Sequence, residues 1–150
     1  MADDQVKVVL FGPDGEVETP WANALGDDLY ELDNTPWFAY GLSWKDVIEA
    51  RPPAPGEWPE FVRVVKKSGY RTVRVMLEPP ADKSEESRRF LARINEIGCT
   101  YEGMNQRLIC IDVPPAVDLM VIREYLIASG QEWEHADPTY EQLGFNDPQA

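Results

Sequence analysis

The chain has 150 residues, of which 43% are hydrophobic and 11% are aromatic. These values exclude an intrinsically disordered chain, and a fold of this length buries a sizeable core without disulfide or metal support. No apolar run reaches the roughly 18 residues of a membrane span, and the start "MADDQVKVVL" lacks the features of a secretory signal. We therefore expect a cytoplasmic protein that does not bind membranes.

The net charge of -13 is distributed unevenly along the chain. Residues 1–60 sum to -10, residues 61–77 to +5 and residues 78–150 to -8. Such a field repels nucleic acid and acidic membranes and speeds encounters with basic proteins. An acidic surface that serves only solubility is the alternative explanation.

The first half of the chain is predicted to be β-rich. Val6–Phe11 is a β-branched run that ends at the turn sequence "GPDG", and residues 16–25 resume an extended pattern. Further short strands are predicted at residues 29–32, 45–50 and 60–68, and prolines interrupt every possible helix before Ser84. Short strands with frequent turns suggest a small barrel or a strongly curved sheet.

The stretch "LDNTPWFAYGLSWKDV", residues 32–47, concentrates aromatic side chains in a segment without helical character. In a small barrel aromatic side chains supply the bulk of the core, so at least two of Trp21, Trp37, Phe38 and Trp44 should be buried. We assign Trp37 and Phe38 to the core, and Tyr40 and Trp44 to the surface.

The second half of the chain alternates strands and helices. Residues 71–77 form a predicted strand, and a helix follows in which Asp82 or Ser84 is the N-cap and Gly98 the stop. A hairpin about Met104 and Asn105 leads to a second helix. Its predicted apolar stripe comprises Val117, Val121, Ile122, Tyr125 and Leu126, and Gly130 is its stop.

A last strand at residues 132–136 completes the order β-α-β-β-α-β, which is typical of ferredoxin-like folds. We therefore predict an α+β fold. A barrel-like half spans residues 1–68, a ferredoxin-like half spans residues 69–140, and a tail spans residues 141–150.

The sequence carries few residues suited to catalysis. His135 is the single histidine, flanked by acidic residues, and a structural or surface role is favoured for it over a catalytic one. Motifs of hydrolases, zinc proteases and nucleotide-binding loops are absent from the sequence. Asp27, Asp28 and Asp33 lack calcium-loop spacing and are typical of turns. We expect no enzyme activity, no metal and no cofactor.

Two cysteines flank the predicted hairpin. Cys99 and Cys110 could face each other across it, so a disulfide is geometrically possible. In a reducing cytoplasm, two small buried apolar residues are the favoured interpretation.

The basic segment between Arg63 and Arg74 could bind nucleic acid, with Tyr70 as a stacking platform. RNA-binding domains of ferredoxin-like fold place aromatic side chains on their central strands, whereas "RTVRVML" and "RLICIDV" contain none. We therefore expect no nucleic-acid partner.

Motifs across residues 17–130 resemble those of the bacterial family known as domain of unknown function 4265. The family pattern has a Trp-Ala pair, Tyr-x-Leu-Asp-Asn-x-Pro, an aromatic pair, Gly-x-Ser, Asp-x-Val, Ser-Gly and Val-Pro-Pro. The matching residues here are Trp21, Ala22, Tyr30, Leu32, Asp33, Asn34, Pro36, Trp37, Phe38, Gly41, Ser43, Asp46, Val47, Ser68, Gly69, Val113, Pro114 and Pro115. Some members are similar to immunity proteins of polymorphic toxins. The resemblance implies no catalytic activity.

Charge and resemblance together predict an acidic protein-binding module, an immunity protein or inhibitor that neutralises a basic bacterial toxin. Its predicted partner-binding residues are Asp27, Asp28, Glu31, Asp33, Tyr40 and Trp44. The alternative is a small regulatory domain that binds an anionic ligand through Arg63, Arg71 or Arg74. The sequence leaves the oligomeric state open.

Overall fold

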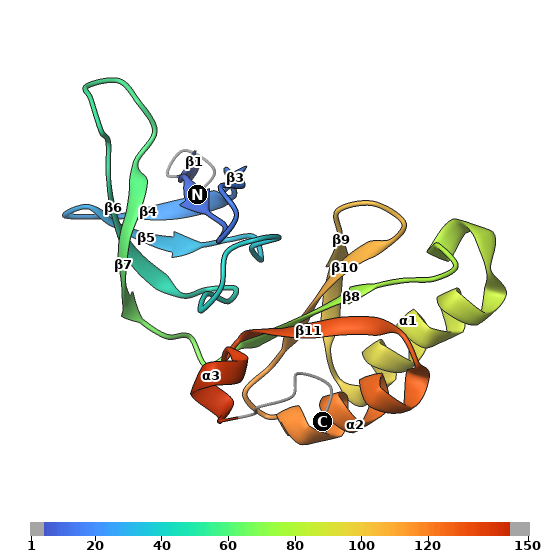
Figure 1. The fold of residues 1–150 in the computed structure, drawn as a ribbon. Coiled ribbons are helices and arrows are strands. Elements are labelled where there is room, and N and C mark those ends of the chain that lie inside the picture. The colour runs from blue at the N-terminus through green and yellow to red at the C-terminus, as the bar shows by residue number, and fades with distance from the viewer. Residues whose placement is uncertain (1–4, 145–150) are drawn as a thin grey trace. The chain divides into compact units, whose positions relative to one another are not determined.

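A computed structural model describes residues 5–144 of the chain (Figure 1). The chain divides after Tyr70 into two compact units. The described part of the first unit is built from strands, and the second unit combines strands with helices, which confirms the predicted α+β class. Between residues 5 and 144, no helix is both long enough and apolar enough to cross a membrane.

The described part of the first unit contains seven short strands. They are β1 (Gln5–Lys7), β2 (Leu10–Phe11), β3 (Val17–Glu18), β4 (Trp21–Gly26), β5 (Leu29–Leu32), β6 (Val47–Arg51) and β7 (Glu60–Lys66). Five of them make an antiparallel sheet in the order β1-β4-β5-β6-β7, and β2 pairs with β3 in a separate hairpin.

The five-stranded sheet is open, so the prediction of a barrel is wrong. Among the described residues, the N-terminal segment meets β7 at one isolated parallel bridge, Val9 with Glu60. The Val9 N–H donates to the Pro59 carbonyl at 2.8 Å, and the Phe61 N–H donates to the Val9 carbonyl at 3.0 Å. The contact does not extend into a ladder because the chain turns away at Leu10 to pair with β3.

Two predicted strands are each divided in the structure. Residues 6–11 form β1 and β2 because the chain changes its pairing partner, from β4 to β3, at Val8 and Val9. Residues 16–25 form β3 and β4, with Pro20 between them. Proline has no N–H to donate to a strand ladder, which explains the interruption.

The core of the first unit is aliphatic, which corrects the prediction of an aromatic core. Its buried members are Val8, Leu10, Ala22, Leu32, Ala39, Leu42, Ile48 and Ala50. Trp37 and Phe38 are only half-buried and Trp21 is exposed. The loop of residues 33–46 contributes Ala39 and Leu42 to this core. Aliphatic side chains of the loop therefore pack on the sheet, where we expected its aromatic side chains.

The second unit contains β8 (Arg71–Met76), α1 (Glu85–Ile97), β9 (Thr100–Gly103), β10 (Leu108–Val113), α2 (Leu119–Ser129), β11 (Glu132–Asp137) and α3 (Tyr140–Leu143), with a 3-10 turn at Ala81–Lys83. Its antiparallel sheet has the order β11-β8-β10-β9. Both long helices lie on the same side of this sheet (Figure 1).

Both ends of α1 and the C-terminal end of α2 follow the sequence prediction. The Ser84 side chain accepts from the Ser87 N–H at 3.2 Å at the start of α1, and Gly98 ends that helix in the left-handed conformation. Asp118 caps α2 in the same manner, and Gly130 ends it. Glycine is favoured at such ends because it has no Cβ to clash.

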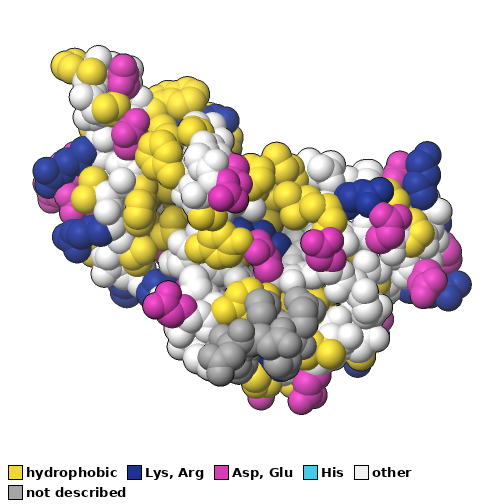
Figure 2. All heavy atoms as spheres, in the orientation of Figure 1, with side chains coloured by type: hydrophobic (Ala, Val, Ile, Leu, Met, Phe, Trp, Pro, Cys, Tyr) yellow, Lys and Arg dark blue, Asp and Glu magenta, His cyan; other side chains and the backbone are white. Residues whose placement is uncertain are grey.

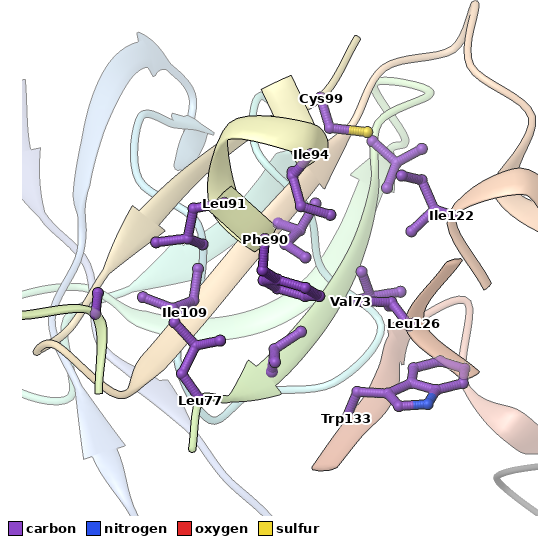
Figure 3. Packing of buried hydrophobic residues seen from close by; sticks show 14 of the residues in the cluster. Val73, Leu77, Phe90, Leu91, Ile94, Cys99, Ile109, Ile122, Leu126 and Trp133 are labelled. Atoms are coloured by element: carbon purple, nitrogen blue, oxygen red, sulfur yellow. The ribbon is translucent and has the colours of Figure 1, made fainter. Parts of the chain in front are cut away.

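Alternate residues of β8 and β10 pack against the two helices. Phe90, Leu91 and Ile94 of α1 and Ile122 and Leu126 of α2 meet Val73, Leu77, Ile109 and Trp133 of the sheet (Figure 3). The predicted stripe of α2 is wrong at Val121, which is 47% exposed. Its other members pack in or against the core, although Val117 precedes the helix. Because the helix begins after Asp118, its buried face comprises Leu119, Ile122 and Leu126.

The C-terminal part of the predicted tail lies outside the described residues. Residues 141–144 belong to α3 and its glycine cap, with Thr139 and Gln142 in a capping box. Residues 145–150, like residues 1–4, are not described.

Candidate functional site

The tip of the β4–β5 hairpin carries two exposed carboxylates. Asp27 and Asp28 form its two-residue turn with φ angles of 57° and 63°. Turns in which both central residues have positive φ match the twist of antiparallel strands, and aspartate tolerates this conformation better than most residues. Asp28 Oδ2 lies 3.5 Å from Arg51 Nε, so the sequence prediction of turn aspartates is confirmed at these positions.

Strand β4 points its large side chains to solvent. Ala22 is fully buried, whereas Trp21 and Leu25 are 44% and 54% exposed. Ala24 is exposed too, and the register with β5 shifts between Ala24 and Gly26, so the contrast with the core is clearest at Trp21 and Ala22. This is the reverse of the usual pattern, in which the larger apolar side chains of a strand face the core. Packing within the unit does not explain this arrangement.

Two of the predicted carboxylates lie beside Trp21. The Asp33 N–H donates to the Trp21 carbonyl at 2.9 Å, which places the two residues opposite each other across β4 and β5. Glu31 accepts from Asn23 at 3.4 Å, and Gln5 Nε2 donates to Asp33 at 2.6 Å. We define the outer surface as Lys7, Trp21, Asn23, Leu25, Glu31 and Asp33.

A cation also adjoins the tryptophan of this surface. Lys7 Nζ lies 4.8 Å from the centroid of the Trp21 ring, within the range of a cation–π contact. The outer surface therefore already holds one cation against an aromatic face, with carboxylates alongside.

The loop of residues 33–46 is held by a buried glutamate. Glu18, 8% exposed, accepts from the backbone N–H groups of Trp37, Phe38 and Ala39 at 2.6, 2.8 and 2.9 Å. A carboxylate that accepts several N–H groups compensates for its own burial and also satisfies donors that lie outside any ladder. The aromatic segment is consequently fixed without a helix.

A second buried carboxylate holds the end of the same loop. Asp46 is fully buried and accepts from the N–H groups of Ser43 and Ser68, both at 2.8 Å. It also forms an ion pair with Lys67, whose ammonium donates to the Gly41 carbonyl at 3.0 Å. Between these anchors Tyr40 is 40% exposed, as the surface assignment requires.

Trp44 differs from its predicted position at the surface, because it is half-buried. Its ring meets the edge of Tyr70 at a centroid distance of 5.0 Å, and Lys45 Nζ lies 4.5 Å from its centroid. Its carbonyl accepts from the Ser68 hydroxyl at 2.7 Å. The structure therefore gives Trp44 a packing role, and part of its side chain remains in contact with solvent.

The three arginines of the alternative anion site are engaged within their own units. Arg63 donates to Glu49 at 2.7 Å. Arg71 donates to the carbonyls of Pro114 and Val117 on the helix side of β8. Arg74 is 4% exposed on the opposite face of that strand and pairs with Glu134 at 3.2 Å.

The possible catalytic groups of the second unit are buried. His135 is fully buried between the rings of Trp133 and Tyr140, and burial lowers its pKa to about 4, with Arg123 adding to the shift. Burial raises the pKa of the Cys99 thiol to about 11, so this thiol stays protonated. Cys99 and Cys110 are both free, and they lie on opposite faces of the sheet, which rules out the hairpin disulfide.

Acidic, histidine and cysteine side chains do not gather into a metal site anywhere in residues 5–144. Asp28 and Asp33 are separated by the length of β5, and each has its own polar partner. The turn interpretation is confirmed for Asp28, whereas Asp33 lies directly after β5.

Two exposed apolar pairs were missed by the sequence analysis. Trp21 and Leu25 are one pair, and Phe11 with Val17 is the other, 48% and 60% exposed and directly opposite each other in the β2–β3 hairpin. The available indication was the pair Trp21–Ala22, since a strand with Ala22 inside points Trp21 outward. Hydrophobic side chains are visible among charged ones on this unit, at the upper left of Figure 2.

Comparison with known proteins gives a family and a fold. A crystal structure of a hypothetical protein from Neisseria gonorrhoeae is similar to this chain, with a TM-score of 0.64 and 18% sequence identity. The match covers 89% of this chain and 94% of the other. No curated protein matches the sequence. The model of the family "Domain of unknown function (DUF4265)" matches residues 18–136, and the chain therefore belongs to this family.

Proposed function

We propose that this chain is a non-catalytic protein-binding module whose outer surface docks on a basic protein. The observation that carries the proposal is the reversed pattern of β4, which exposes Trp21 and Leu25 beside the carboxylates of Glu31 and Asp33. Large apolar side chains that a strand keeps in solvent, next to unneutralised charge, are typical of binding surfaces.

The rigidity of the surface supports high affinity. Trp21 lies on a sheet strand with a neighbour on each side, and Tyr40 lies on a loop fixed by Glu18 and Asp46. Aromatic side chains on a fixed backbone lose little conformational entropy on binding. Such residues are the usual energetic centres of interfaces.

The charge of the chain supports a basic partner. A net charge of -13 accelerates association with cationic proteins and disfavours nucleic acid. Within the outer surface, Lys7 is the one cation, against Glu31 and Asp33. Asp27 adds an exposed carboxylate at the hairpin tip.

The resemblance to immunity proteins suggests which class of basic protein the partner belongs to. We infer that the chain acts in the cytoplasm and neutralises a basic bacterial toxin by covering its active site. A module without catalytic groups suits this role, because inhibition by occlusion needs only shape and charge complementarity. A toxin gene adjacent to the gene of this chain is expected.

Co-expression with the product of that neighbouring gene tests the proposal. The chain should restore growth, and the purified proteins should bind. Replacing Trp21 and Leu25 together by Ala, or Tyr40 and Trp44 together by Ala, should weaken binding by about 2 kcal/mol or more. Trp58→Ala is the matched control, since Trp58 is 54% exposed in the β6–β7 loop and lies outside the outer surface.

Two results would overturn the proposal. One is unchanged affinity and unchanged rescue in both double variants, measured by calorimetry and by growth. The other is turnover of a small substrate by the chain alone.

We also propose that the second unit is ferredoxin-like. The order β8-α1-β9-β10-α2-β11 and the sheet order β11-β8-β10-β9 support this assignment, as do the two helices on one face. An experimental structure of the second unit in which the strand order differs would contradict it.

A further inference from the structure

The two long helices of the second unit present different faces to solvent. Both pack on the same side of the sheet through apolar residues, such as Ile122 and Leu126 of α2 (Figure 3). On α1 the solvent side is charged, and its side chains pair along the helix, as Arg88 does with Glu85 at 3.0 Å. On α2 the solvent side is mostly apolar.

The exposed side chains of α2 form one row. Met120, Val121 and Ile127 are 38%, 47% and 41% exposed, and Ala128 is exposed as well. Residues three or four positions apart are neighbours on a helix surface. These four apolar residues therefore surround Glu124, which lies three or four positions from each of them. We name Met120, Val121, Glu124, Ile127 and Ala128 the exposed face of α2.

Core packing does not account for the exposed face of α2. Its four apolar residues lie outside the core cluster of the second unit. A helix at the surface of a domain usually turns charged side chains to solvent, as α1 does. Apolar side chains gathered on one exposed face are instead typical of a surface that another molecule covers.

Glu124 determines which charge the covering molecule must carry. Its side chain is exposed and forms no ion pair within residues 5–144. A carboxylate in the middle of an apolar contact loses its hydration on docking, and a cation of the partner offsets this cost. A second copy of this chain is disfavoured, because two such faces in contact at their centres bring two Glu124 carboxylates together.

A depression borders the C-terminal end of this face. It has a volume of about 300 Å³ and lies between α1 and α2, with Tyr125 and Ala128 in its wall and Glu86 and Arg89 opposite. This volume is at the small end of the range for ligand pockets, so the depression can receive a single large side chain of a docked helix.

We propose that the exposed face of α2 binds an amphipathic helix of a partner protein, one that carries a lysine or arginine within its apolar stripe. The apolar side chains of that helix pack on Met120, Val121 and Ile127, and its cation pairs with Glu124. Packing of two helices along apolar rows is a common mode of recognition. The outer surface belongs to the first unit, so this inference goes beyond the proposed function.

Three labelled peptides test the proposal, each titrated against the full chain by fluorescence anisotropy. Each is about 18 residues long, enough to form a helix when bound. The first has a leucine stripe with one central lysine, and the second has glutamate in place of that lysine. The third has the composition of the first in an order without a stripe. The chain should bind the first peptide about tenfold more tightly than the third.

A charge reversal tests the role of Glu124. The parent should prefer the lysine peptide to the glutamate peptide by about fivefold, and Glu124→Lys should prefer the glutamate peptide instead, because the ion pair is restored with opposite signs. Glu141→Lys is the matched control, since it makes the same change of charge at an exposed position of α3. It should keep the preference of the parent.

A double truncation tests the apolar part of the face. Val121→Ser with Ile127→Ser should weaken binding of the lysine peptide about tenfold. Val62→Ser with Val65→Ser is the matched control, at sites 50% and 41% exposed in β7, and it should change binding by about twofold at most. Circular dichroism of each variant checks that the fold is retained.

Four results would each overturn the proposal. One is an unchanged peptide preference in Glu124→Lys, and another is equal binding of the peptide without a stripe. Loss of binding in the Trp21→Ala, Leu25→Ala variant would place the peptide on the outer surface. Vesicles of equal phosphatidylglycerol and phosphatidylcholine that bind the parent, but not the Val121→Ser, Ile127→Ser variant, would assign the face to a lipid surface.

Discussion

The two units solve the problem of stability in different ways. The second unit buries 15 hydrophobic residues in one cluster beneath two helices, whereas the first buries eight, most of them small or of medium size. The first unit nevertheless leaves the larger set of big hydrophobic side chains exposed, namely Phe11, Val17, Trp21, Leu25, Tyr40, Trp58, Val62 and Val65.

The difference indicates where each unit places its polar groups. In the second unit helices satisfy most backbone donors outside the sheet. In the first, buried carboxylates from Glu18 and Asp46 take over that task for a loop without regular structure. Anchoring a loop by charge leaves its aromatic side chains outside the aliphatic core, half-buried or exposed.

Truncation of the helical core should give the largest change. Ile122 is fully buried, and Ile122→Ala should lower the free energy of unfolding by about 4 kcal/mol through lost burial and the cavity left behind. Ile127→Ala on the same helix, at a site 41% exposed, should cost less than about 1 kcal/mol. Urea denaturation followed by circular dichroism measures both. Equal losses would contradict the assignment of the buried face of α2.

Removal of Glu18, which anchors the loop of residues 33–46, should cause the second-largest loss of stability. Glu18→Ala should cost about 3 kcal/mol, because it leaves three backbone N–H groups without their acceptor. Hydrogen exchange at Trp37, Phe38 and Ala39 should accelerate selectively, while amides of β8 keep their protection. Glu57→Ala, at an exposed loop position, is the control. Unchanged exchange at these three amides would show that the loop is held by other contacts.

Acidification should weaken the second unit through His135. Its pKa is about 4 in the folded state and 6.5 when unfolded, so below pH 6.5 the unfolded chain binds a proton that the folded one does not. Stability from this group is therefore lost as the pH falls, by about 2 kcal/mol between pH 7 and pH 5. In His135→Phe, the unfolding free energy of the second unit should vary less across this window. A variant as pH-dependent as the parent would exclude His135 as the cause.

The smallest effect is expected at the hairpin tip. Asp28→Asn removes the charge that pairs with Arg51 and keeps a side chain that tolerates the positive φ of this position, so stability should change by no more than about 0.5 kcal/mol. Thermal unfolding at low and high salt measures it. A large loss that salt removes would mean that this ion pair contributes more than its exposure allows.

The second unit was predictable because its signals are local. The cap at Ser84, the stops at Gly98 and Gly130 and the alternation in β8 and β10 each depend on a few neighbouring residues. The face of α2 was predicted except at Val121, which is exposed, and Leu119, which was missed, since a nearly uniformly apolar helix has little periodicity.

The first unit was less predictable because its organisation depends on distant pairs. Glu18 binds amides about 20 positions away, and Asp46 binds Ser68, contacts that no local pattern reveals. In the outer surface, too, some residues were predictable from the sequence and others were not. Glu31 and Asp33 were predicted from charge. Their neighbour Trp21 was not predicted as a surface residue, because it was one of four aromatic side chains considered for the core of a barrel that the sheet does not form.

The placement of the tryptophans gives the molecule built-in fluorescent reporters. Trp21, Trp37, Trp44 and Trp58 belong to the first unit, and Trp133 alone, 4% exposed, belongs to the second. Acrylamide should quench Trp21 and Trp58 readily and reach Trp133 only when the second unit opens. Docking of a partner and unfolding of the helical half can thus be followed separately by emission, without attaching a dye.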